Sequence, residues 1–393
     1  MFFTQSPSYA ETAVGTETIL HNYFGVNLHM DNCCKGNYSD VDEIIARLEY
    51  IGARRVRDWA TKDDVIDAWL KIHSATGAKF HVSIPQTSPE NQRVALARID
   101  RWLKKYPDLI DVIEGSNEPD THYPASQGAS LEDSADFQSD VYSVGKKHNV
   151  PVAQLSVGGG WKAPFYEGNY KEFGKPPADF GNAHVYMNPN APPSSTLKRI
   201  GDLAAYSVGG KPVDITEFGT YKSKKHDEDS VNAFMHIAPF SSYLLGNVGL
   251  FVYALNDDMS GVISFYDDKG NPRPFADYWH NTTKLLSDKN GKNLPAKEID
   301  ISFTNQNYKG KAPLGIKNVL MYKSDGSIWI ATYDEERPET DSGSQTIQFD
   351  KLYKSVTIFD GRDGRIVKQY RDVGSVDVEF PINQLYLIKI SDK

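Results

Sequence analysis

Residues 110–119 read Ile-Asp-Val-Ile-Glu-Gly-Ser-Asn-Glu-Pro, a short apolar run that ends in polar residues. The spacing of apolar residues predicts one amphipathic helix before it, over about Asn91–Lys105, and another after it, over about Leu131–Lys147. A short buried strand between two longer helices is typical of a βα unit on a parallel sheet. The stretch therefore predicts that the surrounding chain is built from repeats of this unit.

Seven further apolar runs follow the same pattern between about Tyr23 and Leu286. Eight βα units over roughly 260 residues are typical of a (β/α)8 TIM barrel, an α/β fold. A doubly wound open sheet is the alternative, but no Gly-x-Gly-x-x-Gly motif follows the first strand. The eight predicted strands begin at Phe24, Arg55, Lys79, Ile110, Val152, Gly181, Pro212 and Gly249.

The pattern changes after about Lys289, where helical periodicity stops and short β-branched runs appear. Eight such runs, separated by turns such as Ser-Asp-Gly, predict a small antiparallel β-sandwich of about 100 residues. We therefore expect a barrel over residues 1–290 and a sandwich over residues 291–393. We also expect the segment before about Thr18 to join the sandwich.

Composition and charge narrow the possible partners. The net charge of −9 argues against a nucleic-acid partner, because nucleic-acid-binding surfaces are basic. No stretch approaches the ~20 apolar residues that a membrane span requires. No signal peptide is visible at the start, so we expect either a mature form of a secreted or periplasmic protein or a cytoplasmic one. We further expect a monomer.

Polar residues at the ends of the predicted strands indicate the site, because active sites of (β/α)8 barrels lie at the carboxyl ends of the strands. Glu118 follows the fourth strand and Glu217 ends the seventh. Two such carboxylates can cleave a glycosidic bond, one as the acid and the other as nucleophile or base. A separation near ~5.5 Å gives retention and one of ~6.5–9.5 Å gives inversion, so the sequence leaves the stereochemistry open.

The two motifs, Ser116-Asn-Glu-Pro119 and Thr216-Glu-Phe-Gly219, resemble those of the clan A, or 4/7, superfamily of retaining glycoside hydrolases. The plan of a barrel and a β-sandwich, with Arg-Val-Arg-Asp on the second strand, is most similar to family 39 and neighbouring bacterial members. The resemblance covers roughly residues 20–290. It implies that Glu118 is the acid/base and Glu217 the nucleophile. The implied substrate is a β-linked polysaccharide or oligosaccharide, of the plant or bacterial exopolysaccharide type.

The resemblance also implies roles for four supporting residues. Arg57 would order the nucleophile, although the sequence also allows it to pair with Asp58 or Glu114. Asn117 would bond the sugar 2-hydroxyl. In the strand-six motif His-Val-Tyr, His184 would lie near the acid/base and Tyr186 would hold the nucleophile.

Aromatic residues are further substrate-binding candidates. Tyr253 stands at the end of the eighth strand, where many clan members have a Trp beneath the cleaved sugar. This departure leaves the identity of that sugar open. Trp161, after the fifth strand, is the best candidate for a sugar platform, and His29 ends the first strand. The implied mechanism uses no metal or cofactor, so we expect neither. A transglycosylase with the same site and a non-catalytic carbohydrate-binding barrel are the alternative functions.

Overall fold

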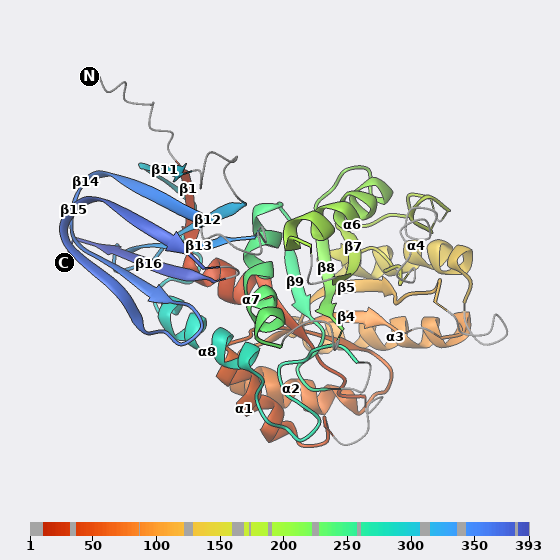
Figure 1. The fold of residues 1–393 in the computed structure, drawn as a ribbon. Helices are drawn as coiled ribbons and strands as arrows, with labels where there is room; N and C mark the ends of the chain where they lie inside the picture. Colours follow the sequence, from red (N-terminus) through yellow and green to blue (C-terminus); the bar gives the residue numbers. More distant parts are fainter. Residues whose placement is uncertain are drawn as a thin grey trace.

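The computed structural model describes a (β/α)8 barrel and a second, mostly antiparallel β-domain (Figure 1). The predicted fold class is confirmed. The described residues are 11–31, 37–85, 87–121, 129–158, 169–172, 174–187, 191–221, 228–257, 261–306, 315–335, 343–381 and 384–392.

The barrel sheet has eight strands in the order β6-β5-β4-β3-β2-β9-β8-β7, and every pairing along it is parallel. A bridge between Ala153 and Phe180 joins β6 to the start of β7 and closes the circle. The strands are β2 (Phe24–Asn27), β3 (Arg55–Trp59), β4 (Lys79–Ile84), β5 (Ile110–Ser116), β6 (Val152–Ala153), β7 (Gly181–Met187), β8 (Val213–Thr220) and β9 (Gly249–Val252).

Helices separate most of the barrel strands. Three of them begin at a proline, two or three residues earlier than the apolar periodicity predicts. Proline lacks the backbone N–H that the first helical turn leaves unpaired, so it is well suited to start a helix. The helices are α1 (Val41–Ile51), α2 (Val65–Thr76), α3 (Pro89–Lys105), α4 (Leu131–His148), α6 (Pro193–Ser207), α7 (Glu228–Leu244) and α8 (Pro274–Leu286), preceded by the π-helical segment η1 (Thr18–Tyr23).

Helix α1 shows how local sequence sets these elements. The Asp40 side chain accepts hydrogen bonds from the backbone N–H groups of Asp42 and Glu43 and so caps the helix start. The helix ends at Gly52, whose φ of 72° is a left-handed conformation that glycine adopts without strain. Between these caps, Ile44 and Leu48 are buried against the barrel.

The second domain is one sheet that wraps around its own hydrophobic core. The N-terminal strand β1 (Glu11–Gly15) belongs to this sheet, because it pairs antiparallel with β10 and parallel with β12. The other strands are β10 (Lys297–Ile299), β11 (Ile301–Gln306), β12 (Ile316–Tyr322), β13 (Ile328–Asp334), β14 (Gly343–Asp360), β15 (Ile366–Phe380) and β16 (Tyr386–Ser391).

Two of these strands are longer than the sequence predicts. The apolar runs Thr346–Phe349 and Val356–Phe359 predict two strands but belong to the single strand β14. Likewise, Ile366–Tyr370 and Val376–Phe380 both belong to β15. For β14 the prediction was wrong because the segment 350–355 contains no Gly or Pro to end the strand, and in β15 the residues on either side of Gly374 still pair with β14. The pairing between β14 and β15 continues past this segment with a shift in register.

The two domains share a buried contact along α7. Met321 and Tyr333 of the β-domain belong to the same hydrophobic cluster as the barrel core. In the same contact, the Ser241 hydroxyl donates a hydrogen bond to Glu335 Oε1 at 2.5 Å. Among the described residues, no helix combines the length and the apolar character that a membrane crossing requires.

Candidate active site

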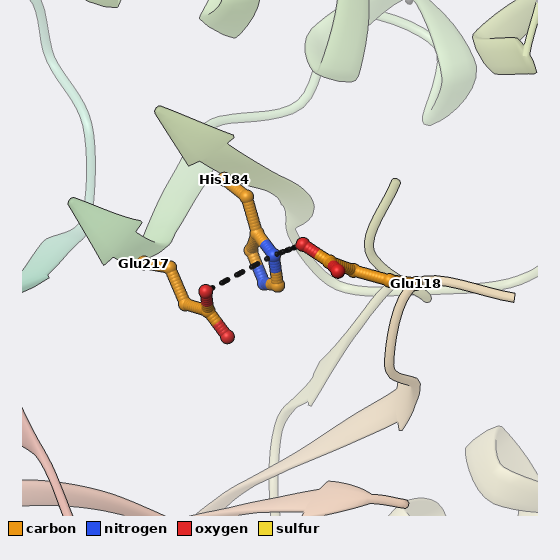
Figure 2. Close-up of side chains that lie close together, drawn as sticks. All are labelled: Glu118, His184 and Glu217. Carbon is orange, nitrogen blue, oxygen red and sulfur yellow. Dashed lines mark hydrogen bonds and ion pairs between the residues drawn. The ribbon is translucent and has the colours of Figure 1, made fainter. Parts of the chain in front are cut away.

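Glu118 and Glu217 lie close together at the carboxyl ends of the barrel strands (Figure 2). Glu217 is part of β8, and its side chain is 6% exposed. Glu118 lies two residues beyond β5, and its side chain is 22% exposed. The backbone of Glu118 has a φ of 41°, and its N–H donates to Ser156 Oγ at 3.1 Å. The barrel thus brings together the two carboxylates that the motifs predict.

His184 of β7 lies between the two carboxylates (Figure 2). Its Nδ1 is 2.6 Å from Glu118 Oε1 and 3.5 Å from Glu217 Oε2, and one atom from each of the three residues lies within 4.8 Å of the others. Burial opposes protonation, but the negative charge of Glu217 and the bond to Glu118 raise the pKa of His184 above its usual value. Protonation of the imidazole would offset the repulsion between the carboxylates.

Two donors hold the Glu217 carboxylate. Arg57 Nη1 donates to Oε1 at 2.7 Å, and the Tyr186 hydroxyl donates to Oε2 at 2.5 Å. Burial and the charge of Glu217 raise the pKa of Tyr186 well above its usual value, so the hydroxyl keeps its proton. Both oxygens of Glu217 are therefore fixed in direction.

The guanidinium of Arg57, with its five N–H groups, donates short hydrogen bonds to four residues and a longer one, of 3.4 Å, to Ser83 Oγ. Nε and Nη2 donate to the two oxygens of Glu114 at 2.7 and 2.8 Å. The remaining donors reach Asn117 Oδ1 at 2.6 Å, Asn27 Oδ1 at 2.8 Å and Glu217. Of the alternatives that the sequence left open, the pair with Glu114 therefore exists together with the bond to Glu217.

Asp58, the other alternative partner of Arg57, has different contacts. Its carboxylate accepts hydrogen bonds from Trp69 Nε1 at 2.8 Å and from the backbone N–H of Trp59 at 2.8 Å. Burial and the charge of Asp31 raise the pKa of Asp58 to about 7. Asp58 thus anchors an indole and the local backbone.

Sequence reasoning missed Glu114 and Asn27 as site residues. Glu114 stands in an apolar strand beside Val112 and Ile113, and its side chain has no exposed surface. A buried carboxylate requires a charged or donor partner, so a Glu inside an apolar strand was the available signal. The amide Nδ2 of Asn27 donates to the carbonyl oxygen of Thr216, next to Glu217. No comparable signal marked Asn27.

Aromatic rings flank the carboxylates on the side of β2 and β9. The ring of Tyr253 lies 6.1 Å from that of Tyr186 and 5.3 Å from that of His29, between centroids. The His29 ring also meets Trp59 edge-on at 5.3 Å. The peptide bond between Tyr253 and Ala254 is cis. Tyr253 and His29 therefore belong to the same region as Glu217, whereas Trp161 lies outside the described residues.

Gly158 packs directly against the Glu118 carboxyl group. A Cβ at position 158 would lie 2.7 Å from Glu118 Oε2 and 2.2 Å from Thr121 Cγ2, too close for real contacts. The N–H of Gly158 donates to Asp120 Oδ1 at 2.8 Å. The lack of a side chain at this position thus leaves the space that Glu118 occupies.

Glu118, His184 and Glu217 are also the one group among the described residues with the spacing of metal ligands. Their ligand atoms already contact one another, and the positive charge of Arg57 lies 2.7 Å from Glu217. A second cation at this position would be repelled by Arg57. The arrangement fits proton transfer and nucleophilic attack better than it fits a metal.

No protein-family model matches the sequence, and no curated protein matches it. Solved structures do share the fold. A family 39 glycoside hydrolase from Bacteroides cellulosilyticus has a TM-score of 0.62 at 12% identity, covering 96% of this chain and 82% of that one. A family 39 β-xylosidase from Caulobacter crescentus has a TM-score of 0.62 at 12% identity, covering 98% of each chain.

A family 30 subfamily 8 xylanase from Clostridium acetobutylicum is a third similar structure. Its TM-score is 0.59 at 10% identity, covering 98% of this chain and 97% of that one. At such low identities the likeness shows a common fold, with the barrel and the β-domain together.

Proposed function

We propose that the protein is a retaining glycoside hydrolase that cleaves a β-linked polysaccharide or oligosaccharide. The observation that carries this proposal is the proximity of the Glu118 and Glu217 carboxylates, with one oxygen of each within 4.8 Å. Retaining enzymes place their carboxyl groups about 5–5.5 Å apart, whereas inverting enzymes leave about 6.5–9.5 Å for a water molecule. The short spacing here supports the retaining alternative.

The first step forms a glycosyl-enzyme ester. One oxygen of Glu217 attacks the anomeric carbon, and the bond from that carbon to the glycosidic oxygen breaks. Glu118 gives its proton to the departing oxygen, so the leaving group departs as a neutral alcohol. Arg57 and Tyr186 aim the Glu217 carboxylate at the carbon throughout.

The second step hydrolyses the ester. Glu118, now a carboxylate, takes a proton from water while the water oxygen attacks the anomeric carbon. The bond to Glu217 breaks, and both glutamates return to their starting states. His184 contacts Glu118 and lies 3.5 Å from Glu217, so it is placed to stabilise negative charge on either side chain.

The surrounding residues fit this chemistry. Asn117 accepts from Arg57 through its amide oxygen, which turns its NH2 group toward a sugar hydroxyl such as the 2-hydroxyl. The ring of Tyr253 lies between those of His29 and Tyr186, and Tyr186 binds Glu217, so Tyr253 and His29 are candidates to contact the sugar at the cleaved position. The similar structures named as a xylanase and a β-xylosidase make β-xylosides the first substrates to test.

A panel of aryl β-glycosides and plant and bacterial polysaccharides tests the proposal. We expect release of the aryl group or of oligosaccharides, with the β-anomer as the first product by NMR. An α-anomer formed first would contradict retention, and binding without cleavage of any substrate would favour a carbohydrate-binding protein. Turnover should persist in EDTA. Transfer of the glycosyl group to added sugars instead of water, seen by mass spectrometry, would indicate a transglycosylase.

A further inference from the structure

Buried charged side chains continue from the candidate nucleophile toward the opposite end of the barrel. His81 Nε2 lies 3.3 Å from Glu114 Oε2, and His81 Nδ1 lies 3.5 Å from Asp214 Oδ2. Arg55 Nη2 is 3.6 Å from the same Asp214 oxygen. Burying so many charges carries a large desolvation cost, and apolar packing of the same volume is often at least as stable. A contribution to the site would explain why the barrel holds charged groups here.

Glu114 is the member of this series that touches the site directly. Its two oxygens accept from Nε and Nη2 of Arg57 in a bidentate pair, and its side chain has no exposed surface. Because the guanidinium is planar, fixing one edge fixes the direction of every other N–H group. The remaining donors then point at Asn27, Asn117 and Glu217.

We propose that Glu114 is a positioning residue for the proposed glycosidase reaction, on which this inference rests. It holds Arg57 in the plane that serves both Glu217 and Asn117. It also divides the positive charge of Arg57 between two carboxylates, so that Glu217 is oriented without losing its reactivity.

The charge of Glu114 is permanent under assay conditions. Burial opposes its ionisation, but the charge and hydrogen bonds of Arg57 hold the pKa of Glu114 far below its usual range. Loss of this negative charge would leave Arg57 facing Glu217 alone. Arg57 would then attract the Glu217 carboxylate more strongly, and the loss of a buried negative charge beside the site would shift the pH profile of the reaction.

Other charged groups also face this cluster, and the test must leave them unchanged. They come from every neighbouring strand: Glu118 beyond β5, His81 on β4, His184 and Tyr186 on β7, Asp214 on β8, Tyr253 beyond β9 and Arg55 on β3.

The test compares Glu114→Gln with Glu114→Asp. Glutamine removes the charge and presents an NH2 group to a donor of Arg57. Aspartate keeps the charge but withdraws it by one methylene. Asp288→Asn is the control for loss of a buried carboxylate, since Asp288 lies at the domain junction and binds Ser324. It should lower the melting temperature and leave the reaction unchanged.

The readout is covalent labelling by 2,4-dinitrophenyl 2-deoxy-2-fluoro-β-glucoside and the matching xyloside, followed by intact mass. Glu217 forms the new bond to the anomeric carbon and dinitrophenolate leaves without needing a proton, so the rate reports on the nucleophile alone. For Glu114→Gln we expect labelling to slow by about 100-fold, the cost of misplacing a reacting group by roughly 1 Å. We also expect the acid limb of its pH–rate profile, where labelling slows on acidification, to move down by about one pH unit.

For Glu114→Asp we expect slower labelling with the acid limb of the wild type. Labelling of Glu114→Gln at the wild-type rate, with an unmoved acid limb, would overturn the inference even if the melting temperature fell. If Glu114→Gln does not fold, wild-type labelling by Glu114→Asp overturns it equally. Failure of the wild type itself to react with either label would instead count against the proposed function.

Discussion

Glu217 lies within strand β8 with its side chain 6% exposed, whereas Glu118 lies beyond the end of β5 with its side chain 22% exposed. Arg57 and Tyr186 fix both oxygens of Glu217. The Glu118 side chain is hydrogen-bonded to His184, and its backbone adopts a left-handed φ. The barrel therefore holds one glutamate from a rigid strand and the other from a loop.

This difference suits two different chemical duties. A nucleophile attacks one carbon along one line, so precise and constant aim is an advantage. An acid/base must reach a leaving oxygen and later a water molecule, so it needs access from solvent. In the proposed mechanism, identical side chains thus acquire separate roles from their surroundings, and each prediction below changes one side of this comparison.

Glu217→Gln should have the largest effect, because no nucleophile remains. We expect turnover of aryl glycosides to fall by about 10⁵-fold or more, while substrate binding persists in calorimetry. Glu132→Gln, at an exposed position of α4, is the matched control and should keep full activity. Normal turnover by Glu217→Gln would show that Glu217 is not the nucleophile.

Glu118→Ala should produce a loss that depends on the leaving group. Substrates with poor leaving groups should react about 10³-fold more slowly, because general acid catalysis is absent. Dinitrophenyl glycosides should still form the glycosyl-enzyme, and azide should restore turnover by yielding a β-glycosyl azide. Absence of this product by mass spectrometry would assign the acid/base role to another residue.

Gly158→Ala should selectively impair acid/base catalysis by Glu118. The new methyl group would lie 2.7 Å from Glu118 Oε2, so the carboxyl group must move away. We expect turnover on poor leaving groups to fall by about tenfold, with less change on dinitrophenyl substrates. Gly201→Ala in α6 is the control, because the nearest atom to its added Cβ is 3.8 Å away. Equal losses on both substrate types would contradict a specific effect on the acid/base.

His184→Asn should give the smallest effect, seen in stability. The pKa of folded His184 is raised, so protonation stabilises the fold below about pH 6.5 and this contribution disappears as pH rises through the raised pKa. The variant should therefore be more destabilised at pH 5.5 than at pH 9, by on the order of 2 °C in melting temperature. A destabilisation that does not vary with pH would show that His184 does not couple to the carboxylates through charge.

The sequence predicted those features that depend on local patterns. Helix α4 begins at the predicted Leu131 and ends one residue beyond the predicted Lys147. Glu118 follows strand β5 as predicted, whereas β8 continues past Glu217 to Thr220. The pairing of Arg57 with both Glu114 and Glu217 depends on which strands face each other across the barrel, and no local pattern encodes that. The prediction of two separate strands where the structure has β14 was wrong for a similar reason. Pairing partners on β15 and β16 keep β14 extended across the segment between the two apolar runs.

Strand β1 also has a consequence for how the chain is made and dissected. It leaves the ribosome well before its neighbours in the sheet, β10 and β12, which begin only at Lys297 and Ile316. The barrel can therefore assemble during synthesis while β1 waits for partners. A recombinant fragment that lacks Glu11–Gly15 would leave β10 and β12 with two open edges, and such edges promote aggregation. In a barrel expressed without the β-domain, β1 would have no pairing partner, so such a fragment should start after this strand, near Thr18.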